Sequence, residues 1–175
     1  MEVSTYVGLL KGVNVGGNNK IAMVQLRELF VSLGYGEVST FIQSGNVIFA
    51  SDGVPDPGDL ERAIATRFDI HVSVAVRTGS DLRRVIRNNP FEVINPSRLF
   101  VGFMTQKPAK SDVEDLDHGF FESERFSVIG AELYLDVPDG MASTKAPDYL
   151  NRRLKVPITM RNWNTVTKLL DLSQS

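Results

Sequence analysis

Apolar residues are spaced in two characteristic ways along the first part of the chain, and together they predict an α+β fold. Residues 4–10 alternate poorly and are mostly apolar, which is typical of a strand buried on both faces. Further on, apolar residues recur at helical spacing at Met23, Leu26, Phe30 and Leu33. Gly34 follows them, so the pattern predicts a helix that ends at this glycine.

The next stretch predicts a hairpin, a second helix and another strand. Two runs of β-forming residues, 38–43 and 47–50, flank Ser44-Gly45-Asn46, which is typical of a tight hairpin turn. A helix is then expected from the spacing of Leu60, Ile64 and Phe68, with Asp59 near its start. Residues 71–76 alternate as a strand does, beginning at His71.

This order of elements (strand, helix, strand, strand, helix, strand) is that of the ferredoxin-like βαββαβ unit. A connecting helix is expected to follow over residues 80–89, capped by Ser80 and ended by Asn89-Pro90. The spacing thus assigns residues 1–78 to a first ferredoxin-like subdomain and residues 79–96 to a connecting helix and loop.

Residues 97–175 repeat the same order. A strand is expected over residues 99–104, and Ser111 and Glu114 fit a capping box for a short helix that extends to Phe120. The remaining elements are expected to be a hairpin of residues 125–129 and 132–137, a helix with Pro147 in its first turn, a strand over 156–160 and a closing C-terminal helix from Trp163. The prediction is therefore two ferredoxin-like subdomains in tandem, related by element order rather than by a visible residue-level repeat, which indicates a duplication.

Composition narrows the class of protein. The chain has 175 residues, 42% of them hydrophobic, and no cysteine, which excludes disulfides, thiolate catalysis and cysteine-ligated zinc. No signal peptide and no run of about 20 apolar residues is visible, so we expect a soluble cytoplasmic protein. The net charge of −2 does not favour a nucleic-acid partner.

Charge is unevenly distributed in the second half. Acidic residues dominate from Asp112 to Asp139, and basic residues dominate from Met141 onward. Two solvated faces explain this distribution most simply, and the alternative is a basic surface that receives an anionic ligand.

The glycine-rich stretch from Lys11 to Lys20 is the first candidate site. It lies between a predicted strand and a predicted helix, where backbone amides can hold an anion. It does not fit G-x-x-x-x-G-K-[ST] or G-x-G-x-x-G, so neither a nucleotide triphosphatase nor a dinucleotide-binding protein is indicated. The candidate ligand-binding residues are Lys11, Asn14, Gly16, Gly17 and Asn18. The alternative is a structural loop whose glycines and asparagines supply positive φ angles.

The predicted hairpin turn is the second candidate, through Gln43, Ser44 and Asn46. It is not a nucleophile elbow, because Ile42 occupies the position of the required glycine. In a βαββαβ sheet the glycine-rich stretch, this turn and the start of the fourth strand lie at one end, so we expect the first two to cluster with His71. His71 is a candidate acid or base, yet nothing spaced like a metal-ligand set accompanies it, and no metal or cofactor is predicted.

The third candidate is the stretch Thr159-Met160-Arg161-Asn162-Trp163-Asn164-Thr165-Val166. An asparagine there is expected to cap the last helix and Trp163 to fill the core. Arg161 is the residue best suited to an anion, because its planar guanidinium fits a carboxylate or phosphate. Asn164 and Lys168 would join it if the second half closes over the glycine-rich stretch.

These three stretches carry a family resemblance. The strings from Leu9 to Gly17, from Thr40 to Val47 and from Thr159 to Leu169 resemble the bacterial domain-of-unknown-function family numbered 1697. Members usually have arginine before the first glycine and tyrosine before the Ile-Gln-Ser-Gly-Asn turn, where this chain has Lys11 and Phe41. The resemblance implies two ferredoxin-like subdomains and no particular reaction.

The sequence thus favours a protein that binds a small polar or anionic ligand, with catalysis left open. The alternative is a nucleic-acid or protein interaction module, since ferredoxin-like sheets can bind RNA through exposed aromatic residues. The basic-glycine-aromatic strand motif of such sheets is absent here, and Phe100, Phe103 and Phe126 are expected in the core. The sequence does not determine the oligomeric state.

Overall fold

The computed structural model describes residues 2–174 and divides the chain into two compact units. The first comprises residues 2–83 together with 168–174, and the second comprises residues 84–167.

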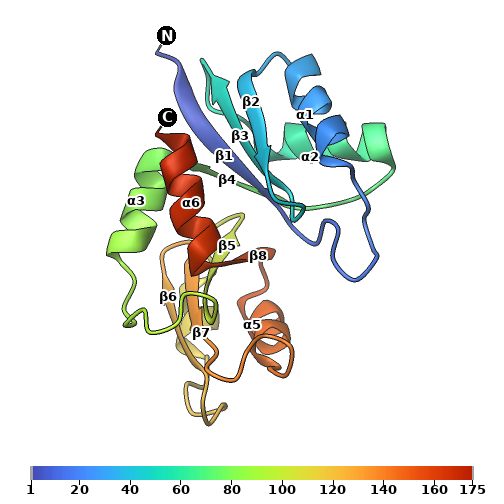
Figure 1. The fold of residues 1–175 in the computed structure, drawn as a ribbon. Coiled ribbons are helices and arrows are strands. Elements are labelled where there is room, and N and C mark those ends of the chain that lie inside the picture. Colours follow the sequence, from blue (N-terminus) through green and yellow to red (C-terminus); the bar gives the residue numbers. More distant parts are fainter. Residues whose placement is uncertain (1, 175) are drawn as a thin grey trace. The chain divides into compact units, whose positions relative to one another are not determined.

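The first unit contains a four-stranded antiparallel sheet with the strand order β2-β3-β1-β4 (Figure 1). Its elements are β1 (Ser4–Leu10), α1 (Met23–Ser32), β2 (Gly36–Phe41), β3 (Asn46–Ser51), α2 (Pro57–Phe68) and β4 (Val74–Thr78). This is the ferredoxin-like order, with the first and third strands at the centre of the sheet.

One core joins α1 and α2 to the first sheet. Leu26 and Phe30 on α1 and Leu60 and Ile64 on α2 are buried in it. Phe49 on β3 packs against the Phe30 ring in an edge-to-face arrangement, with 5.1 Å between ring centroids. Both helices therefore cover the same face of the sheet.

The second unit repeats this arrangement with the strand order β6-β7-β5-β8. The remaining elements of the chain are α3 (Gly79–Arg87), β5 (Leu99–Met104), α4 (Lys110–Glu114), β6 (Arg125–Ile129), β7 (Glu132–Asp136), α5 (Ala146–Leu154), β8 (Ile158–Asn162) and α6 (Trp163–Ser173). Tyr134 is fully buried in this unit, where its hydroxyl donates to the Val85 carbonyl oxygen at 2.6 Å and burial raises its pKa. The α+β fold with two βαββαβ patterns is confirmed.

The strand registers identify equivalent positions in the two sheets. Gly8 pairs with Val47 and Val76, just as Gly102 pairs with Leu133 and Met160.

The same registers make Arg77 on β4 equivalent to Arg161 on β8. Each arginine donates from Nη1 to the carbonyl oxygen of the preceding residue at 2.9 Å. The two sheets therefore match in individual residues as well as in element order.

Two boundaries near β4 differ from the sequence prediction. The strand begins at Val74 rather than His71, because β1 ends at Leu10, which pairs with Val74. The connecting helix begins at Gly79, and its cap is Thr78 rather than Ser80. The Thr78 hydroxyl accepts from the Asp81 amide at 3.0 Å, and the Asp81 carboxylate accepts from the Thr78 amide at 2.9 Å.

The second unit brings two further corrections. No side chain caps α4, whose N-cap is Ala109, so the capping box expected at Ser111 is wrong, and the helix ends at Glu114. The last strand is shifted two residues toward the C-terminus, to Ile158–Asn162. Lys155, the C-cap of α5, has the left-handed conformation, so the chain turns there. Its next strand therefore pairs with β5 only from Ile158 onward.

Side chains bond to three backbone groups on the outer edge of β4. Residues 73, 75 and 77 face β1 in the antiparallel register, so the backbone groups of 74, 76 and 78 point outward. The Glu61 carboxylate accepts from the Val74 amide and the Asp81 carboxylate from the Thr78 amide. The Val76 carbonyl accepts from Arg77.

None of the helices within residues 2–174 combines the length and the apolar character that a bilayer-spanning segment needs.

Candidate functional site

The glycine-rich stretch folds as a tight projecting loop between β1 and α1. Val15 and Asn18 form an antiparallel bridge across Gly16 and Gly17, whose φ angles are +59° and +78°. Positive φ at both central residues is the requirement of a type I′ turn, which glycine meets without strain. Gly16 and Gly17 thus supply the positive φ angles expected of a structural loop. Both residues are exposed, so their backbone amides lie at the surface of the loop tip.

Asn14 fixes this loop to its surroundings. Its Nδ2 donates to the Ile21 carbonyl at 2.9 Å and to the Gln43 carbonyl at 2.7 Å, and its Oδ1 accepts from the Ile21 amide at 2.9 Å. Buried Val13 and Ile21 hold the two ends of the loop in the core. Asn14 thus joins the loop to the 43–46 turn, and the predicted clustering of these two segments at one end of the sheet is correct.

The turn is also internally bonded. Asn46 is fully buried, and its Nδ2 donates to the Phe41 carbonyl at 2.9 Å and to the Ser44 hydroxyl at 3.1 Å. The Leu10 amide donates to the Gly45 carbonyl at 2.9 Å. Ser44 and Asn46 therefore shape the turn.

A groove of about 460 Å³ opens between the loop and the turn. Its lining residues are Asn14, Gly17, Lys20, Ile21, Ala22 and Gln43. Ala22 is the N-cap of α1, and neither its side chain nor any acidic residue of the first turn compensates the free amides there. Lys20 adds a positive charge at the same place, so the groove combines features that attract an anion.

Replacing Asn14 by alanine should lower the free energy of unfolding by about 2–3 kcal/mol. The substitution removes three hydrogen bonds and forces alanine into a left-handed conformation, since Asn14 has a φ of +56°. Urea unfolding followed by circular dichroism measures the loss. Asn14→Gly removes the same bonds but tolerates the backbone angle, so equal losses in both variants would contradict a conformational contribution.

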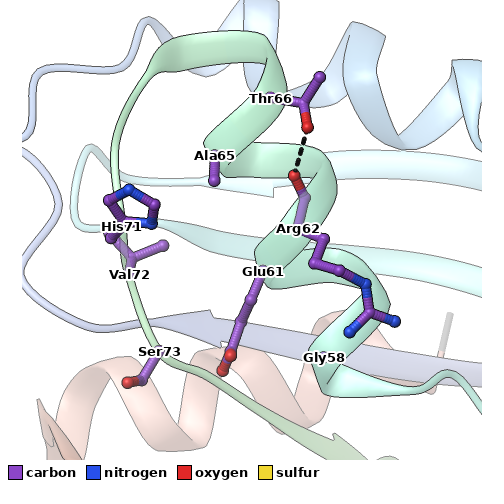
Figure 2. A pocket seen from close by; sticks show the side chains of 8 residues that line it. All are labelled: Gly58, Glu61, Arg62, Ala65, Thr66, His71, Val72 and Ser73. Carbon is purple, nitrogen blue, oxygen red and sulfur yellow. Dashed lines mark hydrogen bonds between the residues drawn. The ribbon is translucent and has the colours of Figure 1, made fainter.

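A second groove of about 580 Å³ lies beside α2 (Figure 2). It is lined by Gly58, Glu61, Arg62, Ala65, Thr66, His71, Val72 and Ser73. His71 thus lies on the connection to β4, in a groove whose lining shares no residue with the loop groove. Ser73 links the neighbourhoods, because its carbonyl accepts from the Lys11 amide at 2.9 Å.

The remaining sequence candidates lie on β8 and α6. Arg161 is only 7% exposed, and burial lowers its pKa to about 10. Asn162 caps α6, since its Oδ1 accepts from the Thr165 amide at 2.9 Å. Asn164 and Lys168 are exposed on that helix. That Arg161, Asn164 and Lys168 contribute to the glycine-rich site stays a prediction.

Three lining residues of the loop groove, Lys20, Ile21 and Ala22, were missed as candidates, and two of them matter for charge. Lys20 ends the glycine-rich stretch and Ala22 is the N-cap of the helix, and neither fits a named motif. A signal for both was available, because a lysine directly before a helix without a capping side chain leaves amides and a cation close together.

The described part of the chain contains no group of three His, Cys, Asp or Glu side chains placed to hold a metal ion.

The fold and the loop define a class of protein: two ferredoxin-like subdomains in tandem, the first of which carries a fixed glycine-rich loop. The family profile described as protein of unknown function, DUF1697, matches residues 3–134, and the chain belongs to this family. The chain is also similar to a solved structure, described as that of the conserved bacterial protein SP0830 from Streptococcus pneumoniae. The two are 26% identical with a TM-score of 0.69, over 98% of this chain and 99% of that chain. No curated protein matches it.

Proposed function

We propose that the first unit binds a small anionic ligand, a phosphate or a carboxylate, in the groove between the 11–20 loop and the 43–46 turn. The observation that carries the proposal is that Lys20 and the uncapped amino end of α1 line the same groove as Gln43. Amides at a helix start and a lysine ammonium both favour negative charge, and the Gln43 amide adds a donor.

The fixed shape of the loop supports this proposal. Because Asn14 bonds to both Ile21 and Gln43, the two walls of the groove are held together before a ligand arrives. Binding to a pre-formed site avoids the entropy cost of ordering a loop. The exposed amides at Gly16 and Gly17 are further donors for a ligand that extends toward the tip of the loop.

Lys20→Gln should weaken phosphate binding about 5- to 10-fold, because one charge-assisted contact contributes roughly 1 kcal/mol beyond a neutral one. The measurement is an amide NMR titration with inorganic phosphate at constant ionic strength, followed at Gly17, Lys20 and Gln43. Lys110→Gln is the matched control, because this lysine is 89% exposed and belongs to the second unit. No phosphate-dependent shifts in the wild type, or equal affinity in both variants, would contradict the proposal.

A nucleic-acid or protein interaction module remains the second candidate, and no observation on the described residues favours it over the anion site. A cytoplasmic location likewise stays a prediction. We also infer that the two halves arose by duplication. The inference is supported by the equivalence of Gly8 with Gly102 and of Arg77 with Arg161.

A further inference from the structure

The groove beside α2 has the chemistry of a second site, of opposite charge preference to the loop groove. Its volume of about 580 Å³ lies in the range of small-molecule pockets. Figure 2 shows Glu61 extending from α2 and Ser73 from the facing connection, with His71 further along that connection and opposite Ala65.

Glu61 is held in place in this groove. Its Oε1 accepts from the Val74 amide at 2.9 Å, across the gap between α2 and the edge of β4. A carboxylate offers about four lone-pair positions on two oxygens, so a single bond to an amide leaves most of its acceptor capacity unused.

The charge of Glu61 is not neutralised by the neighbouring arginine. Arg62 pairs with Asp59 instead, and both of these side chains are largely exposed, at 71% and 67%. In Figure 2 the Arg62 side chain extends away from Glu61. Within residues 2–174, no cationic side chain forms an ion pair with Glu61.

The other polar side chains of the groove are those of Arg62, Thr66, His71 and Ser73, and Arg62, the one cation among them, is paired with Asp59. A histidine imidazole in its neutral form offers one acceptor nitrogen, which His71 can supply, whereas the Ser73 hydroxyl points away from Glu61 (Figure 2). Ala65 and Val72 supply an apolar wall. A carboxylate with a further acceptor and an apolar wall in the same groove is complementary to an ammonium group on a short alkyl chain.

We propose that this groove binds a small aliphatic primary amine, with Glu61 as the counter-ion of its ammonium group, His71 as a further acceptor, and Ala65 and Val72 against its alkyl chain. The proposal does not depend on the anion site, because the two grooves share no lining residue.

An NMR titration of the full chain with n-butylammonium tests this proposal. We expect saturable shifts of the Ala65, Ser73 and Val74 amides and of the His71 ring protons, with millimolar affinity. Butyrate, which has the same alkyl chain and the opposite charge, should leave these signals unchanged. Equal shifts with both ions, or none with either, would overturn the proposal.

Glu61→Gln should weaken n-butylammonium binding at least tenfold, because it removes the charge and keeps an oxygen that accepts from Val74. Glu28→Gln is the matched control on the exposed side of α1 and should bind as the wild type does. Ala65→Leu leaves Glu61 intact and narrows the groove, so it should also weaken binding. Wild-type affinity in both Glu61→Gln and Ala65→Leu would overturn the proposal, whatever the outcome of the phosphate titration.

Discussion

Replacing Gly102 by alanine is expected to lower the free energy of unfolding of the second unit by about 2–3 kcal/mol. A Cβ at this position would lie 2.6 Å from Ile158 Cγ2, 2.8 Å from Met160 Sδ and 3.2 Å from Leu133 Cβ. Methionine can move aside, but the branched side chain of Ile158 is stiff and Leu133 is fixed by its strand. Urea unfolding followed by the fluorescence of Trp163, the single tryptophan, reports on this unit.

Gly8→Ala is the matched control, because Gly8 holds the equivalent position in the first sheet. A Cβ there would meet Phe49 and Phe30 no closer than 3.6 Å, which is ordinary van der Waals contact. Alanine also lowers the entropy of the unfolded chain, so the change in stability should be near zero or slightly favourable. A loss in Gly8→Ala as large as that in Gly102→Ala would contradict the steric explanation.

The substitution Gly45→Ala should cost about 2–4 kcal/mol, with the damage confined to the first unit. Gly45 has a φ of +83°, and a Cβ would lie 2.9 Å from Leu10 Cβ and 3.3 Å from Val13 Cβ. Both neighbours are fully buried, so neither can move into solvent. Amide hydrogen exchange of β1 and β3 should accelerate, while β5 and β7 keep their protection.

Gly34→Ala separates the two costs of an alanine at Gly45, which are the strained backbone angle and the steric overlap of the Cβ. Gly34 has a similar φ of +91°, but no atom lies within 4 Å of the position of its Cβ. It therefore carries only the backbone cost, about 1–2 kcal/mol. If Gly34→Ala and Gly45→Ala destabilise the protein equally, the overlap with Leu10 and Val13 has no effect.

The sequence predicted the fold well because its main signals are local. The period of apolar residues, the glycines at turns and Pro147 at a helix start each act within a few residues, and they lead directly to two βαββαβ patterns. The errors fall where a boundary depends on a distant partner. β4 begins at Val74 because β1 ends opposite it, and nothing within residues 71–76 carries that information.

The candidate site was predicted in position more than in detail. Topology alone brought the glycine-rich loop to the 43–46 turn, and the hydrogen bond from Asn14 to Gln43 bears this out. The roles of individual side chains followed less directly. The side-chain amides of Asn14 and Asn46 donate to backbone carbonyls. The sequence shows that an asparagine is present, but not which group its amide will bond to.

Alternation along a strand also hides the environment of Arg161. Ile158 and Met160 belong to the core beneath α5, so Thr159 and Arg161, which alternate with them, point to the other face of the sheet. A charged residue at such a position normally indicates a solvated face, yet Arg161 is buried.

The three side-chain bonds along the outer edge of β4 have a consequence for how this protein behaves at high concentration. A bare edge strand recruits strands from other molecules and so seeds aggregation or amyloid-like pairing. Here Glu61 and Asp81 occupy two of the outward amides and Arg77 occupies a carbonyl, so an incoming chain would have to displace these charged groups to pair with those three backbone groups. The first sheet ends at β4, where side chains of the same unit bond to backbone groups that a further strand would need.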